Sequence, residues 1–162
     1  MTKIRTTREW RVGLVMHLGR PVEPIASHFP ATIAALSQVP SLRSALFSVM
    51  EAGAELGDHV GPNAGVLRYH LGVIGTEGSG LRIDGEVYPY EDGSSILFDD
   101  TVVHSGWNRS NNDRVTLFCE VLRTLTGATE LMNRLTQALL TVDPRYRRAP
   151  QRAVEWHRAL NH

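Results

Sequence analysis

The chain has 162 residues, 42% hydrophobic and 21% charged, which predicts a single domain (residues 1–162) with one ordinary core. Lys plus Arg equals Asp plus Glu at 17 each, so there is no net field to attract nucleic acid or an anionic membrane, and neither is expected as a partner. The one cysteine, Cys119, excludes an internal disulfide and a thiolate zinc cluster. Any metal must therefore be held by His, Asp or Glu.

The first residues do not have the pattern of a signal peptide. Their apolar stretch VGLVMHLG is broken by His17, and no small-residue cleavage site follows it. No run approaches the roughly 18 apolar residues of a membrane span. We therefore expect a cytoplasmic protein.

The pattern of elements changes twice along the chain. After an irregular, proline-marked opening, SHFPATIAALSQVP predicts a short helix that Pro40 ends. From about residue 42, short β-like runs follow one another: SALFSVM, GVLRYHLGVIG, LRIDGEVYPY, SSILFDDTVVH and RVTLFCEVLRTL. Turn-forming pieces separate them, which predicts an antiparallel sandwich or barrel. Beyond residue 126, GATELMNRLTQALLTV and APQRAVEWHRALNH are helical in period and predict a C-terminal helical appendage.

Polar residues with catalytic potential gather in the β-rich section, at strand ends or on strand faces where a barrel mouth would collect them. They are His59, Arg68, His70, Arg82, Asp99, Asp100, His104, Asn108 and Arg114. A nucleophilic hydrolase is poorly supported, because there is no G-x-S-x-G and Cys119 lies in the apolar run TLFCEVL, typical of a buried, inert thiol. The sequence contains neither a P-loop nor a G-x-G-x-x-G followed by a helix, which argues against nucleotide binding.

Two histidines from separate strands suit a non-haem iron site, in which imidazoles hold Fe(II) and open positions admit cosubstrate and oxygen. The usual version adds a carboxylate as H-x-D or H-x-E. Here the tripeptides that begin at His59 and at His70 are HVG and HLG, so glycine stands where the carboxylate residue would be. By spacing alone the site is incomplete, and a lone histidine on a strand is more often structural.

Several ordered motifs resemble one known family. LFSVMEAGAELGDHVGPNAGVLRYHLGV, ILFDDTVVHSGWN and RVTLFCEVLR resemble the aspartyl/asparaginyl β-hydroxylases, which are Fe(II)- and 2-oxoglutarate-dependent dioxygenases. The likeness covers about residues 28–125 and implies a mainly β, double-stranded β-helix core of the jelly-roll or cupin-like kind. An N-terminal helix and C-terminal helices (126–162) would complete the domain.

The resemblance also implies a metal site. The iron ligands would be His59 of HVGP and His104 of FDDTVVH, and Gly61 would occupy the position of the missing carboxylate. The place beside Gly61 would then be open to a water or another small ligand. Asp100, four residues before His104, is expected to accept a hydrogen bond from that water and so to act as a catalytic residue.

The same resemblance implies the cosubstrate contacts. Arg68 and His70 of LRYH, and Ser48 and Met50 of FSVM, would contact 2-oxoglutarate, and Arg114 of RVTLF would pair with its distal carboxylate. Residues 68 and 70 share one face of a strand. A guanidinium such as that of Arg114 suits a bidentate pair with a carboxylate.

The leading prediction is a dioxygenase that uses Fe(II), 2-oxoglutarate and dioxygen to hydroxylate an unactivated C–H bond. The expected substrate is an amino acid, an aspartyl or asparaginyl residue of a peptide, or an amino-acid-derived small molecule. Lipid substrates, which the resemblance also implies for membrane-anchored relatives, are disfavoured because the sequence shows no hydrophobic anchor. The alternatives are a halogenase that binds chloride beside Gly61 and a non-catalytic cupin-like binding module. Any homodimer is expected to form through the C-terminal helices.

Overall fold

The computed structural model describes residues 6–144 and 146–151. Its strands are β1 (Trp10–His17), β2 (Arg20–Pro21), β3 (Leu42–Met50), β4 (Glu55–His59), β5 (Val66–Ile74), β6 (Ser79–Ile83), β7 (Glu86–Pro89), β8 (Ser95–Phe98), β9 (His104–Asn108) and β10 (Arg114–Leu122). Its helices are the 3-10 turn η1 (Ala26–His28), α1 (Pro30–Leu36) and α2 (Gly127–Val142).

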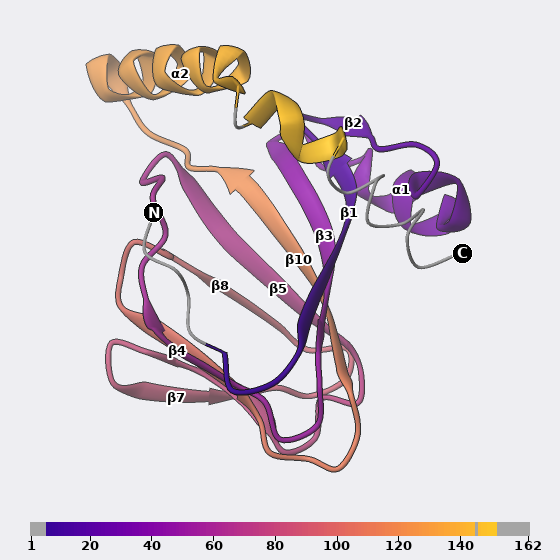
Figure 1. Cartoon of the computed structure of the whole chain (residues 1–162). Helices are drawn as coiled ribbons and strands as arrows, with labels where there is room; N and C mark the ends of the chain where they lie inside the picture. The colour runs from indigo at the N-terminus through magenta and orange to yellow at the C-terminus, as the bar shows by residue number, and fades with distance from the viewer. Residues whose placement is uncertain (1–5, 145, 152–162) are drawn as a thin grey trace.

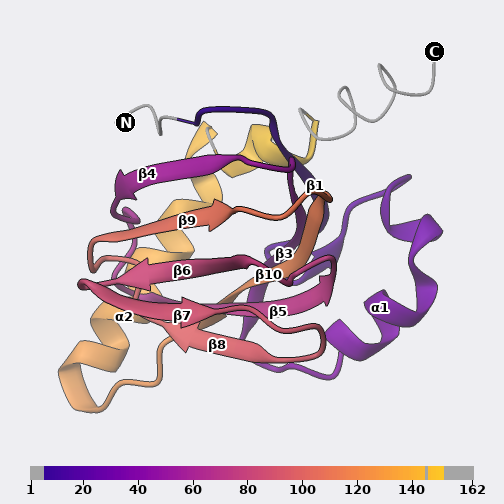
Figure 2. The same ribbon diagram turned by 90° about the horizontal axis from the view of Figure 1, so that it is seen from below.

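The strands form two antiparallel sheets that pack face to face (Figure 1). One has the order β2-β1-β3-β10-β5-β8, and the other has the order β4-β9-β6-β7, which Figure 2 shows face-on. Neighbours in space are mostly not neighbours in sequence, as in a jelly roll. The predicted fold class, a jelly-roll or cupin-like β domain with an N-terminal and a C-terminal helix, is confirmed.

The outer face of the six-stranded sheet carries the larger apolar core. Ala45 of β3 and Leu117 of β10 pack there with Leu36 of α1, because alternate strand residues point to the same side. Cys119 belongs to this cluster, and burial raises the pKa of its thiol to about 11. The predicted inert thiol is therefore confirmed, and the opposite face of the sheet is left for polar side chains.

Four strands lie where no strand was expected. Two of these are β2, in the opening, and β9, which begins at the last residue of the predicted run SSILFDDTVVH, while residues 99–103 of that run form a loop. The other two are β1 and β4. β1 replaces part of the predicted irregular opening and pairs with β3 from Trp10↔Met50 to His17↔Ser44. A register shift between Leu14 and Met16 breaks the alternation that would have indicated a strand. β4 lies inside a segment rich in turn formers, and its register with β9 is also interrupted. Irregular pairing at both strands concealed the pattern.

The C-terminal helical appendage begins as predicted. α2 covers Gly127–Val142, and residues 146–151 are also helical. The rest of the second predicted helix, residues 152–162, lies outside the described residues. In the part of the chain that the structure describes, no helix is both long and apolar enough to cross a membrane.

Asn108 braces the turn that leads into β10. Its side chain is fully buried, and Nδ2 donates to the carbonyl oxygens of Met50 at 2.9 Å, Glu51 at 3.2 Å and Asn112 at 2.8 Å. Its Oδ1 accepts hydrogen bonds from the main chain and hydroxyl of Ser110. Asn108 thus links β9 to the segments that carry Met50 and Arg114.

Asn108→Ala is expected to lower the free energy of unfolding by roughly 2–4 kcal/mol, because it leaves buried carbonyl groups without a donor. Urea denaturation measures the change. Asn111→Ala, in the exposed part of the same turn, is the matched control and should cost less than about 0.5 kcal/mol. Equal stability of the two variants would contradict the bracing role.

Candidate active site

Two histidines face each other at the ends of neighbouring strands in the small sheet. His59 ends β4 and His104 begins β9, and the two are direct partners in the antiparallel register. Their ring centroids lie 4.1 Å apart with an interplanar angle of 54°. The pairing of β4 with β9 therefore brings together the two residues predicted to hold a metal.

Hydrogen bonds orient both rings in the same way. His59 Nδ1 lies 2.8 Å from the carbonyl oxygen of Gly57, and His104 Nδ1 lies 2.8 Å from that of Val102. A carbonyl oxygen only accepts, so each Nδ1 carries the proton, and in the neutral ring Nε2 keeps its lone pair. Burial lowers the pKa of His104, and the neighbouring His59 adds to this effect. Both Nε2 atoms are thus suited to bind a metal ion.

Asp100 occupies the space beside Gly61. A Cβ atom added at Gly61 would lie 2.0 Å from Asp100 Oδ2, so no other residue fits there without displacing the carboxylate. The main-chain N–H of Gly61 also donates to the carbonyl oxygen of Asp100 at 2.5 Å. The place predicted to be open to a small ligand is therefore largely filled by a carboxylate from the loop after β8.

Arg68 holds that carboxylate in place. Its Nε donates to Asp100 Oδ2 at 2.6 Å, and its Nη1 donates to Glu120 Oε1 at 2.5 Å. Its guanidinium also lies 4.7 Å above the ring of Phe118. Arg68, predicted to contact 2-oxoglutarate, is thus already paired with two carboxylates and acts on the site through Asp100.

Arg114 has a different environment. It is buried against the ring of Tyr90 at 5.1 Å, and its Nε and Nη1 have no hydrogen-bond partner among the described residues. A buried guanidinium stays charged, and leaving its donors unpaired is costly. A carboxylate guest would supply the acceptor and the opposite charge that this guanidinium lacks.

His70 presents a second unused donor. Its Nδ1 lies 2.5 Å from the hydroxyl of Tyr90, while its buried Nε2 is unpartnered within the described chain. Burial lowers the pKa of His70 well below its usual value, and the charges of Arg114 and Arg68 act in the same direction. Burial also raises the pKa of Tyr90, which therefore keeps its proton and can donate it to Nδ1. The neutral His70 ring then carries N–H at Nε2.

Ser48 and Met50 lie beside Arg114 on the inner face of the large sheet. Met50 is the direct partner of Arg114 in the register, and Ser48 is the diagonal neighbour two residues away. The indole Nε1 of Trp10 donates to Ser48 Oγ at 2.9 Å, so the Ser48 hydroxyl proton remains available to a guest. The predicted cosubstrate contacts other than Arg68 thus lie on one face of the large sheet. Among them, Arg114 and Ser48 have hydrogen-bond donors that no described residue uses.

A metal would find two histidine ligands rather than three protein ligands. Within residues 6–144 and 146–151, no group of three His, Cys, Asp or Glu side chains is arranged to hold an ion. His59 and His104 offer their Nε2 atoms, and the buried Asp100 Oδ1 has no partner in the described structure. This donor set fits a metal whose other positions are taken by water or by small ligands, one of which Asp100 can orient.

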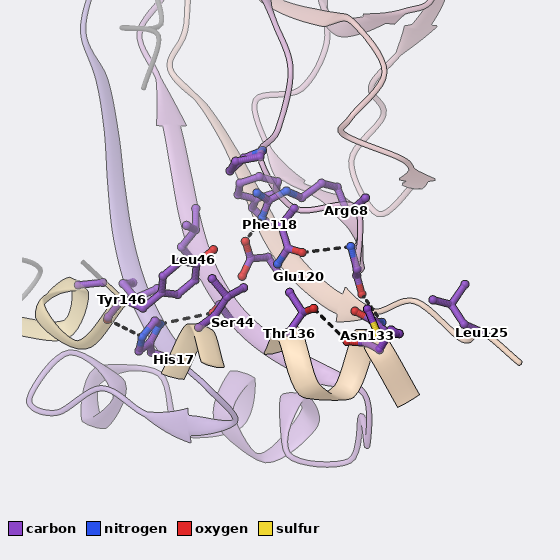
Figure 3. A pocket seen from close by; sticks show the side chains of 18 of the residues that line it. His17, Ser44, Leu46, Arg68, Phe118, Glu120, Leu125, Asn133, Thr136 and Tyr146 are labelled. Atoms are coloured by element: carbon purple, nitrogen blue, oxygen red, sulfur yellow. Dashed lines mark hydrogen bonds and ion pairs between the residues drawn. The ribbon is translucent and has the colours of Figure 1, made fainter. Parts of the chain in front are cut away.

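A pocket of about 760 Å³ opens next to this site, between the end of the sandwich and α2 (Figure 3). Leu46, Phe118, Met132 and Leu140 contribute apolar walls, and Arg68 and Glu120 lie toward the sheet interior. Pro62, three residues after His59, also lines it. Because Arg68 binds Asp100, the inner end of the pocket adjoins the histidine pair.

Polar contacts fix α2 over this pocket. Asn133 Nδ2 donates to the carbonyl oxygen of Gly65 at 3.0 Å, and Gln137 Nε2 donates to Asn63 Oδ1 at 3.0 Å. A Cβ at Gly65 would lie 2.0 Å from Asn133 Oδ1, so glycine permits the close approach. The loop that follows the first histidine is therefore tied to the C-terminal helix.

Several residues of the site had no recognisable signal. Tyr90 and Trp10 act on His70 and Ser48 from elements whose register only the fold defines. Glu120 was not among the predicted site residues, although it lies two residues after Phe118 on β10 and therefore on the same inner face. Arg82, by contrast, is exposed on β6, away from this face.

The fold resembles known cupin domains. The Cnp3 cupin domain of Schizosaccharomyces pombe aligns with a TM-score of 0.51 at 10% identity over 82% of this chain and 74% of that one. A cupin domain of a transcriptional regulator from Enterobacter cloacae aligns with a TM-score of 0.50 at 14% identity over 72% and 100%. The architecture and the paired histidines thus define a cupin-like protein.

The family follows from sequence comparison. A model of the family described as aspartyl/asparaginyl beta-hydroxylase matches residues 1–124, so the chain belongs to that family. It is 31% identical over 158 residues to an ornithine lipid ester-linked acyl 2-hydroxylase of Rhizobium tropici, over 96% of this chain and 56% of the relative. It is 28% identical over 124 residues to the human aspartyl/asparaginyl beta-hydroxylase, over 73% of this chain and 16% of the relative. The chain thus spans about half of the first relative and a smaller part of the second.

Gly61→Ala is expected to destabilise the protein by about 1–3 kcal/mol, because its methyl group would displace the Asp100 carboxylate. Thermal unfolding measures the change. Gly13→Ala is the control, since a Cβ there meets nothing within 4 Å. In an Asp100→Ala background most of the Gly61→Ala penalty should vanish, and equal penalties in both backgrounds would contradict the proposed clash.

Proposed function

We propose that the protein is an Fe(II)- and 2-oxoglutarate-dependent dioxygenase that hydroxylates an unactivated C–H bond. The observation that carries this proposal is the pair of histidines, whose ring centroids lie 4.1 Å apart with each Nδ1 held by a carbonyl oxygen, together with a buried arginine on the other sheet whose donors are unpaired. Membership of a hydroxylase family supports the same reaction class. The first site suits a metal and the second a carboxylate.

His59 and His104 would hold the metal through Nε2, with their Nδ1 protons fixed by the carbonyl oxygens of Gly57 and Val102. When bound with its cosubstrate, iron supplies the oxidising chemistry that the side chains lack. Asp100 would accept a hydrogen bond at Oδ1 from a water on the metal. Arg68 keeps that carboxylate oriented.

The far carboxylate of 2-oxoglutarate would pair with Arg114 and accept a hydrogen bond from the hydroxyl of Ser48. The Arg114 guanidinium can form a charge-assisted pair with a carboxylate, and its Nε and Nη1 have no other partner among the described residues. The Nε2–H of His70 is a further donor on the same buried face. These groups hold the cosubstrate in one orientation and exclude water from it.

Hydroxylation fits this site better than halogenation. A halogenase would need chloride at the metal beside Gly61, but the Asp100 carboxylate fills that place and would repel an anion. A non-catalytic module is also less favoured, because the histidine pair and Arg114 with its unused donors would have no role in it.

The pocket beside Arg68 bears on the substrate. Its mostly apolar walls would accept a chain of methylene groups, and the charged pair of Arg68 and Glu120 at its inner end would contact a polar group. The Rhizobium tropici relative, named for a lipid acyl chain, aligns over 96% of this chain, whereas the human one aligns over 73%. An amino-acid-derived molecule with an apolar chain is therefore the favoured substrate class.

His59→Ala and His104→Ala are each expected to abolish Fe(II)-dependent release of succinate and to weaken Fe(II) binding by more than the roughly 10–100-fold that loss of a supporting group costs. Anaerobic metal titration measures binding. His28→Ala, which removes an exposed histidine elsewhere, is the control and should bind Fe(II) like the parent protein. Unchanged binding in either site variant would refute the ligand assignment.

Arg114→Ala should raise the KM for 2-oxoglutarate at least about tenfold, because the buried carboxylate loses its charged partner. The KM for the organic substrate should change less than about threefold. Arg82→Ala removes an exposed arginine and is the matched control. If both KM values rise equally, Arg114 does not hold the cosubstrate.

A further inference from the structure

The outer side of α2 is an apolar surface that no other described segment of the chain covers. Its large side chains are 54–70% exposed, and they are Leu131, Met132, Leu135, Leu139 and Val142. The spacing of these residues places them on one arc of the helix, which we call the α2 stripe. Monomeric proteins rarely expose so many large apolar side chains together without a binding role.

The neighbouring arc of the same helix faces the pocket. Thr129, Asn133, Thr136 and Leu140 line the cavity that leads to Arg68, and Met132 belongs both to this lining and to the α2 stripe. The stripe therefore borders the pocket rather than lying apart from it. A chain that leaves an apolar layer at the stripe would enter the pocket without crossing a polar surface.

Basic residues adjoin the C-terminal end of the stripe. A hollow of about 620 Å³ is lined by Arg20, Arg43 and Arg147, with Glu23 as the one carboxylate in its lining. Thr141 also lines it, and Val142 is the last residue of the stripe. Figure 1 shows that the helical residues after α2 lie beside β2, which carries Arg20. The overall charge balance thus conceals a local excess of positive charge.

We propose that α2 is a membrane-contacting helix, which inserts the α2 stripe into the surface of an anionic lipid layer while the arginine-lined hollow binds the headgroups. An apolar arc beside basic side chains is the pattern of helices that lie in the membrane interface. The membrane contact does not depend on the proposed function. The further step, in which the pocket receives an apolar chain from the lipid layer, rests on the proposed function.

A lipid layer fits this surface better than a second copy of the chain. Dimerisation through two α2 stripes packed in parallel would bring the two arginine-lined hollows close together, and like charges repel. It would also cover the edge of the pocket at Met132. This inference departs from the expectation that the protein has no membrane partner, which rested on net charge alone.

Vesicle flotation tests the proposal. The protein should float with vesicles of phosphatidylglycerol and phosphatidylcholine and bind pure phosphatidylcholine at least about tenfold more weakly. Leu135→Glu/Leu139→Glu should reduce binding to the anionic vesicles at least about tenfold. Val87→Glu/Leu97→Glu, which places the same charges at exposed apolar positions on β7 and β8, is the matched control and should bind like the parent protein.

A second pair of variants guards against loss of folding. Leu135→Ala/Leu139→Ala keeps good helix formers and should also weaken binding severalfold. Arg20→Gln/Arg147→Gln should weaken binding on the order of tenfold, with a smaller effect at high salt. Unchanged binding in both pairs would overturn the proposal.

Three further outcomes distinguish membrane contact from dimerisation and from the proposed reaction. No flotation of the parent protein would overturn it, whatever the enzymatic activity. A dimer in light scattering that Leu135→Glu/Leu139→Glu dissociates would assign the stripe to a second copy and also overturn it. Flotation without succinate release under any condition would uphold the membrane contact and reject the proposed reaction.

Discussion

The ion pair between Arg68 and Asp100 is the contact on which the site depends. It joins β5 to the loop after β8, and Asp100 in turn accepts the N–H of Gly61 at the end of the segment that carries His59. Both side chains are largely buried, so removing either partner would leave an uncompensated charge. Gly61 is required because the carboxylate occupies the space that any Cβ would need. Asp100 therefore holds the segment after the first histidine through its main-chain carbonyl and its carboxylate, although it is not one of the two proposed metal ligands.

This arrangement gives the inner face two separate electrostatic regions. Near the histidines, Asp100 and Glu120 neutralise Arg68. Farther along the face, Arg114 has no such carboxylate among the described residues, and burial keeps its donors from water. The contrast between a satisfied and an unsatisfied buried arginine is a strong physical argument for an anionic guest at Arg114. The pocket begins at the satisfied arginine, so substrate and cosubstrate would approach the metal from different directions.

The sequence predicted much of this arrangement, because its motifs lie on strands with regular alternation. The shared face of Ser48, Met50 and Arg114 follows from such strands, whereas the pair of His59 and His104 was implied only by the family resemblance, because His59 lies on β4. β1 and β4 could not be predicted, since register shifts interrupt their pattern. The partners of Arg68 and the filling of the space at Gly61 depend on loop packing across sheets, which no local pattern encodes. The spacing of apolar residues correctly predicted α2 as a helix, but only the structure showed that the α2 stripe stays exposed.

Anaerobic absorption spectroscopy of the protein with Fe(II) and 2-oxoglutarate tests the metal and cosubstrate assignments together. We expect a visible charge-transfer band that requires both components, is lost in His104→Ala, and needs a much higher 2-oxoglutarate concentration in Arg114→Ala. The two changes would place the metal at the histidine pair and the far carboxylate at the buried arginine. A parent protein that binds Fe(II) but gives no band with 2-oxoglutarate, or a band unaffected by either substitution, would contradict these assignments.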